Sequence, residues 1–219
     1  NGVTMSDIEA IYNKLAPEYD SRYRLTKHYV EEAIISGLLC DVLDVGSIES
    51  ILDFGCGTGN MITVGELPAS SYLGVDVSLG MLKVARENYP DYQFQHRDIV
   101  NKNIGKFELI LSIFGQANYI GIEYWANTIK LNKANDGKFI SVMYSNCYKP
   151  EYINGEAKQY TAQQVSDCLL DYGLKHNLVG FSFNIKSEEE MDFMQMHNIQ
   201  QFAMNTGRLD GCNYWLVWG

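Results

Sequence analysis

The residues best suited to chemistry lie in and around a glycine-rich segment that reads Asp53-Phe-Gly55-Cys-Gly57-Thr-Gly59. Glycines at alternate positions let the backbone turn tightly and let a ligand lie against bare peptide N–H groups. Asp53 precedes the first glycine by two residues. An anion there repels a pyrophosphate but attracts a cationic amino group. The segment therefore favours a nucleoside ligand that carries an amino acid over a ligand with two phosphates.

Two other interpretations of these glycines compete with this one. A dinucleotide site, as in nicotinamide-dependent dehydrogenases, needs the spacing G-x-G-x-x-G. Asn60 stands where that spacing needs its third glycine, and Gly59 comes one residue too early. The structural alternative is an ordinary glycine turn between a strand and a helix.

Three runs of the sequence resemble one known family. D-F-G-C-G-T-G, at residues 53–59, resembles the first motif of the class I S-adenosylmethionine (SAM) methyltransferases. Residues 77–86 resemble the V-S-x-x-M-L-x-x-A-R run of the same family. Residues 12–20 resemble the Y-x-x-x-A-x-x-Y-D run that precedes the first strand in many small-molecule methyltransferases. The resemblance is close over residues 50–145 and weak over residues 150–219.

The resemblance implies SAM as the cofactor and S-adenosylhomocysteine (SAH) as its product. Asp76 ends the second predicted strand, where an acidic residue can accept both hydroxyls of a ribose. By the resemblance, Val77 and Met81 would pack on the adenine, and Asp98 would lie near its amino group. The full set of expected cofactor-binding residues is Asp53, Gly55, Cys56, Gly57, Gly59, Asp76, Val77, Met81, Asp98, Ile99, Phe114, Tyr12 and Tyr19.

The acceptor pocket is expected between the N-terminal segment and residues 114–119, 144–152 and 188–206. The candidate bases or orienting groups are Tyr119, His28 and Tyr144, taken as the catalytic set, followed by Tyr148, His176 and His197. For each of them the alternative is a purely structural role, as a side chain that is hydrogen-bonded within the protein or exposed to solvent. A general base is needed only when the acceptor is protonated at neutral pH. The lack of an obvious catalytic triad is therefore no objection, and no metal is expected.

Composition and charge exclude several classes of protein. The formal net charge of −10 repels polyphosphate and disfavours a nucleic acid as the main partner. No apolar run is long enough for a membrane helix, and the N-terminus lacks a charged-then-apolar leader. The five cysteines are scattered without a C-x-x-C pair, which favours a reducing cytoplasm over a disulfide framework or a zinc site. The sequence leaves the oligomeric state open, as monomer or homodimer.

The pattern of apolar residues predicts an α/β fold. We expect a doubly wound, mostly parallel seven-stranded sheet with an antiparallel C-terminal strand and an N-terminal helical lid. The expected strands begin at Ile51 and otherwise cover residues 71–76, 92–95, 107–114, 137–144, 177–185 and 214–218. Helices are expected over residues 6–19, 26–39, 123–131, 161–172 and about 187–206, with a short one after Gly59. The chain then forms one domain, 1–219, with a lid at 1–40, a cofactor-binding core at 41–146 and a substrate side at 147–219.

These expectations lead to one favoured function and two alternatives. The favoured one is metal-independent, in-line transfer of a methyl group from SAM to N or O of a small-molecule acceptor. Ser112-Ile-Phe-Gly115 lacks the polar residue, two prolines and aromatic of amino-methylating DNA and protein-glutamine enzymes. The chain also lacks the Pro-Cys of C5-cytosine enzymes and the strand-end aspartate of catechol-type enzymes. The alternatives are a methyltransferase of protein or RNA and a non-catalytic SAM-binding protein.

Overall fold

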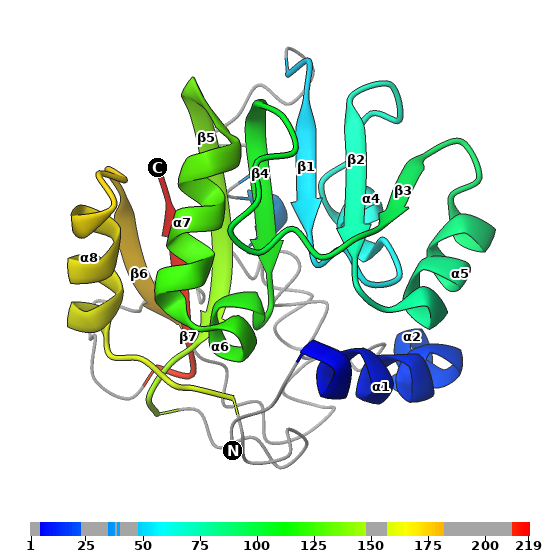
Figure 1. Ribbon diagram of the computed structural model, residues 1–219, viewed down its shortest axis with the longest axis horizontal. Helices are drawn as coiled ribbons and strands as arrows, with labels where there is room; N and C mark the ends of the chain where they lie inside the picture. The colour runs from blue at the N-terminus through cyan, green and yellow to red at the C-terminus, as the bar shows by residue number, and fades with distance from the viewer. Residues whose placement is uncertain (1–4, 23–34, 38, 40–47, 148–156, 182–211) are drawn as a thin grey trace, which may run out of the picture.

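The computed structural model describes residues 5–22, 35–37, 39, 48–147, 157–181 and 212–219. The strands of its seven-stranded sheet are β1 (Ile51–Phe54), β2 (Tyr72–Asp76), β3 (Gln93–His96), β4 (Phe107–Ile113), β5 (Lys133–Tyr144), β6 (Asn177–Phe181) and β7 (Tyr214–Trp218). They lie in the order β3-β2-β1-β4-β5-β7-β6 (Figure 1). Strands β1 to β5 pair in parallel, and β7 runs antiparallel to β5 and β6. The predicted mostly parallel sheet with an antiparallel C-terminal strand is confirmed.

Helices cover the sheet, and the first of them lie below the ends of β1 and β2 in Figure 1. The helices are α1 (Met5–Leu15), the 3-10 helix η1 (Ala16–Glu18), α2 (Tyr19–Arg22), α4 (Asn60–Val64), α5 (Leu79–Asn88), α6 (Gln116–Ile120), α7 (Ile122–Asn132) and α8 (Ala162–Asp171). Trp125 of α7 and Leu169 of α8 belong to one hydrophobic cluster, and Met61 and Ile62 of α4 belong to a second. The sheet therefore carries a hydrophobic layer on each face, as a doubly wound fold requires.

Strand β4 shows why this sheet forms. Its apolar run is buried from Leu109 to Ile113 and pairs with β1 on one side and β5 on the other. Successive side chains of a strand point to opposite faces. Leu109 and Leu111 accordingly pack in the second cluster, while Ile110 packs in the first. A strand buried on both faces reads as a near-continuous apolar run, which is how the sequence predicted it.

Strand β5 begins at Lys133, earlier than the predicted start at Gly137. The pairing with β4 shifts register between Phe107 and Leu109, so an irregular segment precedes the regular ladder. The Lys133 ammonium donates to the carbonyl of Gly137 over 2.6 Å and to that of Ala134 over 3.3 Å. A polar, glycine-containing stretch thus extends the strand because a lysine satisfies its carbonyls.

The N-terminal helix predicted over residues 6–19 is divided into three short pieces. Pro17 lies in the first turn of η1, where its missing N–H costs no helical hydrogen bond. The chain therefore bends between α1 and α2. Most of the predicted helix over 26–39, the end of the strand predicted to 185 and the insertion at 187–206 lie outside the described residues.

The order of the strands positions a crevice. The chain first adds strands on one side of β1, and then crosses to its other side with β4. Loops that follow β1 and β4 therefore leave the sheet edge in different directions, and ligands of open α/β sheets bind in the resulting crevice. The glycine-rich segment follows β1, and residues 114–119 follow β4.

Candidate functional site

A pocket lies at the carboxyl ends of β1, β2 and β4, with about 710 Å³ of space including the part open to solvent. Its lining residues are Ile8, Tyr12, Tyr19, Phe54, Gly55, Gly57, Val75, Asp76, Val77, Met81, Arg97, Asp98, Ile99, Ile113, Phe114, Gln116, Tyr119 and Ile120. The mixed polar and apolar lining suits a small molecule or cofactor. Eleven of the lining residues were predicted from sequence: Tyr12, Tyr19, Gly55, Gly57, Asp76, Val77, Met81, Asp98, Ile99, Phe114 and Tyr119.

The glycine loop turns through left-handed backbone conformations. Gly55, Gly57 and Gly59 have φ angles of 77°, 54° and 84°, a region that other residues rarely adopt. A β-carbon on Gly57 would meet no atom within 4 Å, so the space beside it is open. Gly59 forms the N-cap of α4 and does not line the pocket. The loop therefore presents bare backbone to the pocket at Gly57, where a side chain would fill the ligand's space.

Asp76 ends β2 and faces the glycine loop. Its Oδ2 accepts a hydrogen bond from the Gly57 N–H over 2.9 Å, and its Oδ1 accepts one from the Ser78 N–H over 2.8 Å. Burial raises the pKa of Asp76, although the N–H groups of Ser78 and Gly57 oppose that rise. Each carboxylate oxygen keeps further acceptor capacity. The carboxylate is therefore fixed beside the open backbone and suits a ribose with two neighbouring hydroxyls.

The next part of the wall comes from the residues that follow β2 and β3. Met81 and Ile99 are buried apolar side chains, and Val77 directly follows Asp76 in the sequence. Asp98 accepts a hydrogen bond from the Val100 N–H over 2.9 Å, so its carboxylate is held in place. A flat heterocycle with an exocyclic amino group fits between apolar surfaces of this kind with an acidic residue beside them.

The exit of β4 bends sharply into the pocket. Phe114 has a φ of 60°, which is uncommon for a bulky residue, and Gly115 follows with 98°. The Phe114 ring packs edge-on against Tyr214 at a centroid distance of 5.8 Å. A side chain on Gly115 would press on the rings of Tyr119 and Tyr144. Backbone conformations of this kind persist where the surroundings enforce them, and they gather at ligand sites.

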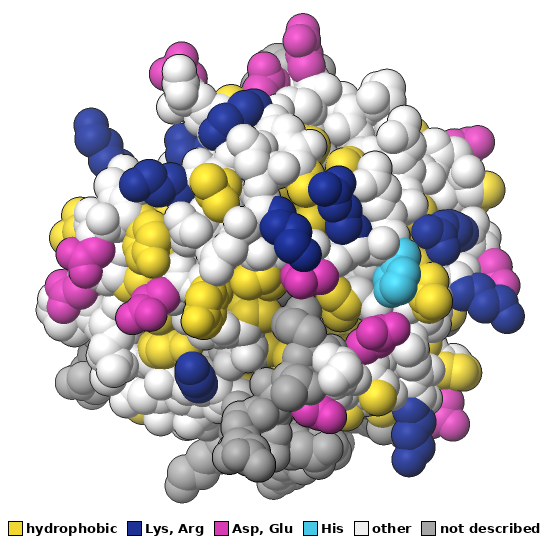
Figure 2. Space-filling model, in the orientation of Figure 1, with side chains coloured by type: hydrophobic (Ala, Val, Ile, Leu, Met, Phe, Trp, Pro, Cys, Tyr) yellow, Lys and Arg dark blue, Asp and Glu magenta, His cyan; other side chains and the backbone are white. Residues whose placement is uncertain are grey.

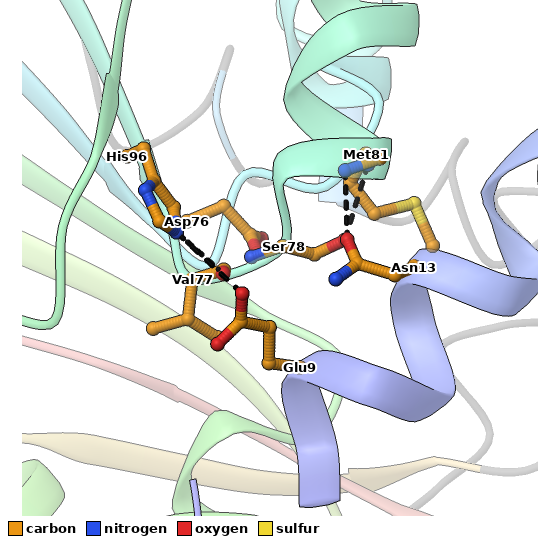
Figure 3. Close-up of polar contacts among 8 residues, drawn as sticks. Glu9, Asn13, Asp76, Val77, Ser78, Met81 and His96 are labelled. Atoms are coloured by element: carbon orange, nitrogen blue, oxygen red, sulfur yellow. Dashed lines mark hydrogen bonds and ion pairs between the residues drawn. The ribbon is translucent and has the colours of Figure 1, made fainter. Parts of the chain in front are cut away.

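Helix α1 closes the pocket from below. Figure 3 shows that Asn13 points to the start of α5, where its Oδ1 accepts hydrogen bonds from Ser78 Oγ and from the Gly80 N–H, each over 2.8 Å. His96 Nε2 lies 2.9 Å from the Val77 carbonyl oxygen and 3.9 Å from a Glu9 carboxylate oxygen. The N-terminal segment is therefore fastened to the strand ends that line the pocket.

Tyr12, Tyr19 and Tyr119 form the wall of the pocket on the side of the N-terminal helices. Tyr12 of α1 lies edge-on to Tyr119 of α6, at a centroid distance of 6.0 Å, and Tyr19 lies 6.2 Å from Tyr12. Tyr144 does not line the pocket, but it lies beside Gly115 behind this wall. Burial raises the pKa of the Tyr12 hydroxyl, and the nearby tyrosine hydroxyls raise it further. At neutral pH the Tyr12 hydroxyl is therefore protonated.

Asp53 does not line the pocket, unlike the expectation from its place before the glycines. It is 1% exposed, and its Oδ2 accepts a hydrogen bond from the Tyr72 hydroxyl over 2.7 Å. Burial raises the pKa of Asp53 to about 7, against the effect of this hydrogen bond. Cys56 is also buried outside the lining, where burial raises the pKa of its thiol. Both side chains support the loop from beneath.

The remaining candidate bases are not brought to the pocket by the described residues. His176 lies between Ser166 of α8 and the Leu174 carbonyl and does not line the pocket. His28, Tyr148 and His197 lie outside the described residues. In the described parts of the chain, no three His, Cys, Asp or Glu side chains come together as a metal site would require.

Sequence reasoning included Gln116 in the expected acceptor pocket, within residues 114–119, but gave it no role of its own. Its Nε2 donates to the Gly55 carbonyl oxygen over 3.2 Å, so the side chain joins the loop after β4 to the loop after β1. The only sequence signal was its place just after a central strand. Asn118, expected at the same exit, is fully buried instead, and its amide binds the backbone of Tyr144 and Lys158.

The fold matches solved structures over nearly the whole chain. A Thermotoga maritima protein described as a SAM-dependent methyltransferase, possible histamine N-methyltransferase, superposes with a TM-score of 0.68 at 13% sequence identity. The match covers 99% of this chain and 99% of that one. Residues 51–135 also match the family described as "Methyltransferase domain", and this span contains the glycine loop, Asp76 and Asp98. Residues 51–135 therefore match a methyltransferase domain, and the chain has the fold of solved SAM-dependent methyltransferases.

Two curated relatives match shorter parts of the chain. The putative methyltransferase 235L of Invertebrate iridescent virus 6 is 34% identical over 77 residues, which is 34% of this chain and 29% of that protein. Demethylmenaquinone methyltransferase of Tropheryma whipplei (strain Twist) is 27% identical over 127 residues, which is 56% of this chain and 53% of that protein. The chain thus spans about half the length of these relatives or less. None of the helices among the described residues is long and apolar enough to cross a membrane.

Proposed function

We propose that this methyltransferase domain transfers a methyl group from SAM to N or O of a small-molecule acceptor, without a metal ion. One observation carries the proposal. A single pocket joins an open glycine loop at Gly57, the fixed carboxylate of Asp76 and a wall of three tyrosines. The first two features suit the nucleoside of SAM, and the tyrosine wall offers a dry surface for an acceptor.

The residues of the pocket would act by binding and orientation. When bound, SAM supplies an electrophilic methyl group on a sulfonium, so the protein needs to hold an acceptor in line with it. Tyr12 and Tyr119 exclude water from one side of the pocket and offer hydroxyls that orient a polar acceptor. Tyr12 remains protonated at neutral pH because burial raises its pKa, so it serves as an orienting group rather than as a base.

A small acceptor is supported by the shape of the site and by the names of similar proteins. Helix α1 and the tyrosine wall close one side of the pocket, which favours an acceptor small enough to enter it. The names of the Tropheryma and Thermotoga proteins refer to small acceptors, demethylmenaquinone and, as a possibility, histamine. We take the class of acceptor, but neither compound, as the proposal for this chain.

Methylation of RNA or protein is the second candidate. The net charge of −10 opposes binding to an RNA backbone. On the face shown in Figure 2, basic and acidic side chains are interspersed among the described residues. A long run of phosphates therefore meets repulsion as well as attraction there.

Labelled SAM separates these candidates. The purified protein is incubated with methyl-labelled SAM and cell extract, and the extract is then fractionated into small molecules, protein and RNA. We expect the label in the small-molecule fraction, with none above the level of an Asp76→Ala variant in the others. Label in protein or RNA would reject the small-molecule assignment. Binding of SAM without label in any fraction would favour a non-catalytic SAM-binding protein.

A further inference from the structure

We propose that Gln116 binds the amino group at the amino-acid end of the ligand. The sequence assigned that cation to Asp53, whose carboxylate instead binds the Tyr72 hydroxyl beneath the loop. Gln116 lies where Asp53 was expected, at the pocket side of the glycine loop. The inference rests on the proposed function, because it takes SAM or SAH as the ligand.

The position of the Gln116 side chain is tightly defined. It is the first residue of α6, directly after the left-handed turn at Phe114 and Gly115. A β-carbon on Gly55 would lie 1.9 Å from Gln116 Nε2, which means that the amide lies directly against the backbone of Gly55. The amide thus crosses from the loop after β4 to the first turn of the glycine loop. The φ of 77° at Gly55 also favours glycine there.

One half of the Gln116 amide lacks a partner. Its Nε2 donates to the Gly55 carbonyl, while its Oε1 is buried without a hydrogen-bond partner among the described residues. It is the one side-chain oxygen or nitrogen in that condition in the described part of the chain. A buried acceptor left without a donor is costly, so such an atom calls for an explanation. A ligand N–H donor in the pocket that Gln116 lines would satisfy it.

The charges around the pocket indicate what this donor is. The acidic side chains that line the described pocket are Asp76 and Asp98, and both are anchored to backbone N–H groups on the β2 and β3 side. Where the loops after β1 and β4 meet, Gln116 Oε1 and the Gly55 carbonyl are neutral acceptors. An ammonium group has three N–H donors and no acceptor, so it suits neutral acceptors of this kind. The nucleoside would then lie toward Asp76 and the amino-acid end toward Gln116.

A comparison of two ligands tests this role without an activity assay. SAH carries the amino-acid end, whereas 5′-methylthioadenosine shares the nucleoside and sulfur but lacks that end. Calorimetric titrations use both ligands on the wild type, on Gln116→Met and Gln116→Ala, and on the control Gln163→Met. Gln163 lies on α8, outside the pocket lining. We expect both Gln116 variants to bind SAH at least about tenfold more weakly and to bind 5′-methylthioadenosine within about twofold of wild type.

The outcomes distinguish this role from the proposed function. Unchanged binding of 5′-methylthioadenosine shows that a variant is folded with an intact nucleoside site. Wild-type affinity for SAH in both variants would overturn the role of Gln116 and leave the proposed function standing. Equal weakening of both ligands would also overturn it, because Gln116 would then support the whole site. A wild-type protein that binds neither ligand would overturn the proposed function and this role together.

Discussion

The Tyr12 hydroxyl donates a hydrogen bond to the Tyr119 hydroxyl over 3.1 Å, joining the first helix of the chain to the loop region after β4. The two residues are 107 positions apart, so this contact exists only when α1 lies against the pocket. Further along the N-terminal segment, the Thr58 hydroxyl donates to Asp20 over 2.6 Å. The N-terminal helices thus form one wall of the pocket, and a ligand in it would lie between them and the strand ends.

Asn13→Ala tests whether this wall retains the ligand. The substitution removes the amide oxygen that accepts from Ser78 and Gly80. We expect SAH to dissociate several-fold faster, and the free energy of unfolding to fall by about 1–2 kcal/mol. Stopped-flow displacement and chemical denaturation measure the two effects. Asn127→Ala, which removes an exposed bond to Asn101, serves as the control, and an equal effect on SAH dissociation there would reject the retaining role.

Gly57→Ala tests the open backbone of the glycine loop. The new methyl group would meet no protein atom, so the protein should fold, with about 1–2 kcal/mol of strain from the left-handed backbone. We expect SAH binding to be lost because the methyl group occupies ligand space. Gly173→Ala is a matched control, since that glycine also has a left-handed φ, of 72°, and a β-carbon added there would meet no atom within 4 Å. Similar melting temperatures with loss of SAH binding in Gly57→Ala alone are expected. Retained binding in both would place the ligand elsewhere.

Asp76→Ala tests the nucleoside end. Removing this carboxylate leaves the Gly57 and Ser78 N–H groups without their acceptor and removes the expected partner of the ribose hydroxyls. We expect binding of SAH and of 5′-methylthioadenosine to weaken together, by about 1–3 kcal/mol. Calorimetry measures both affinities, and exposed Asp91→Ala is the control. A variant that loses SAH but keeps 5′-methylthioadenosine would contradict the assignment of Asp76 to the nucleoside.

Asp53→Asn tests the buried carboxyl beneath the loop. The pKa of Asp53 is raised to about 7 from an ordinary 3.8. The folded state therefore holds this proton more tightly than the unfolded state, and the resulting stability is lost as pH rises through 7. Between pH 5 and 8 we expect wild type to lose roughly 2–3 kcal/mol of unfolding free energy through this group. Denaturation of both proteins at several pH values should show that the free energy of unfolding of Asp53→Asn rises relative to that of wild type as pH rises. A constant difference would mean that Asp53 is ionised throughout.

Local sequence patterns predicted the sheet because each strand carries its own signal. Strand β7 was predicted with its observed bounds, Tyr214–Trp218, and the apolar run of β4 was predicted to within one residue. The predicted start of β5 was wrong because the first carbonyls of the strand are bound by the side chains of Lys106 and Lys133, which a strand-like pattern does not signal. The spacing also predicted that the glycine loop and Asp76 lie close together, because parallel strands end at the same edge of a sheet.

Side-chain direction explains what the sequence could not predict. Asp53 is polar and precedes the glycines, but its direction depends on Tyr72, which lies on the neighbouring strand β2 and offers it a hydroxyl. Gln116 and Asn118 are both amides after β4, yet one lines the pocket and the other binds the backbone of β5. Such differences follow from three-dimensional contacts between distant segments. They become visible only when the strands are assembled.

The central claim is that this pocket binds the nucleoside and amino acid of SAM. Isothermal titration of the purified protein with SAH, beside NADH as a control, tests it most directly. The arrangement of Gly57, Asp76 and Gln116 predicts micromolar binding of SAH and none of NADH. Binding of neither ligand by well-folded protein, or of NADH alone, would contradict the claim.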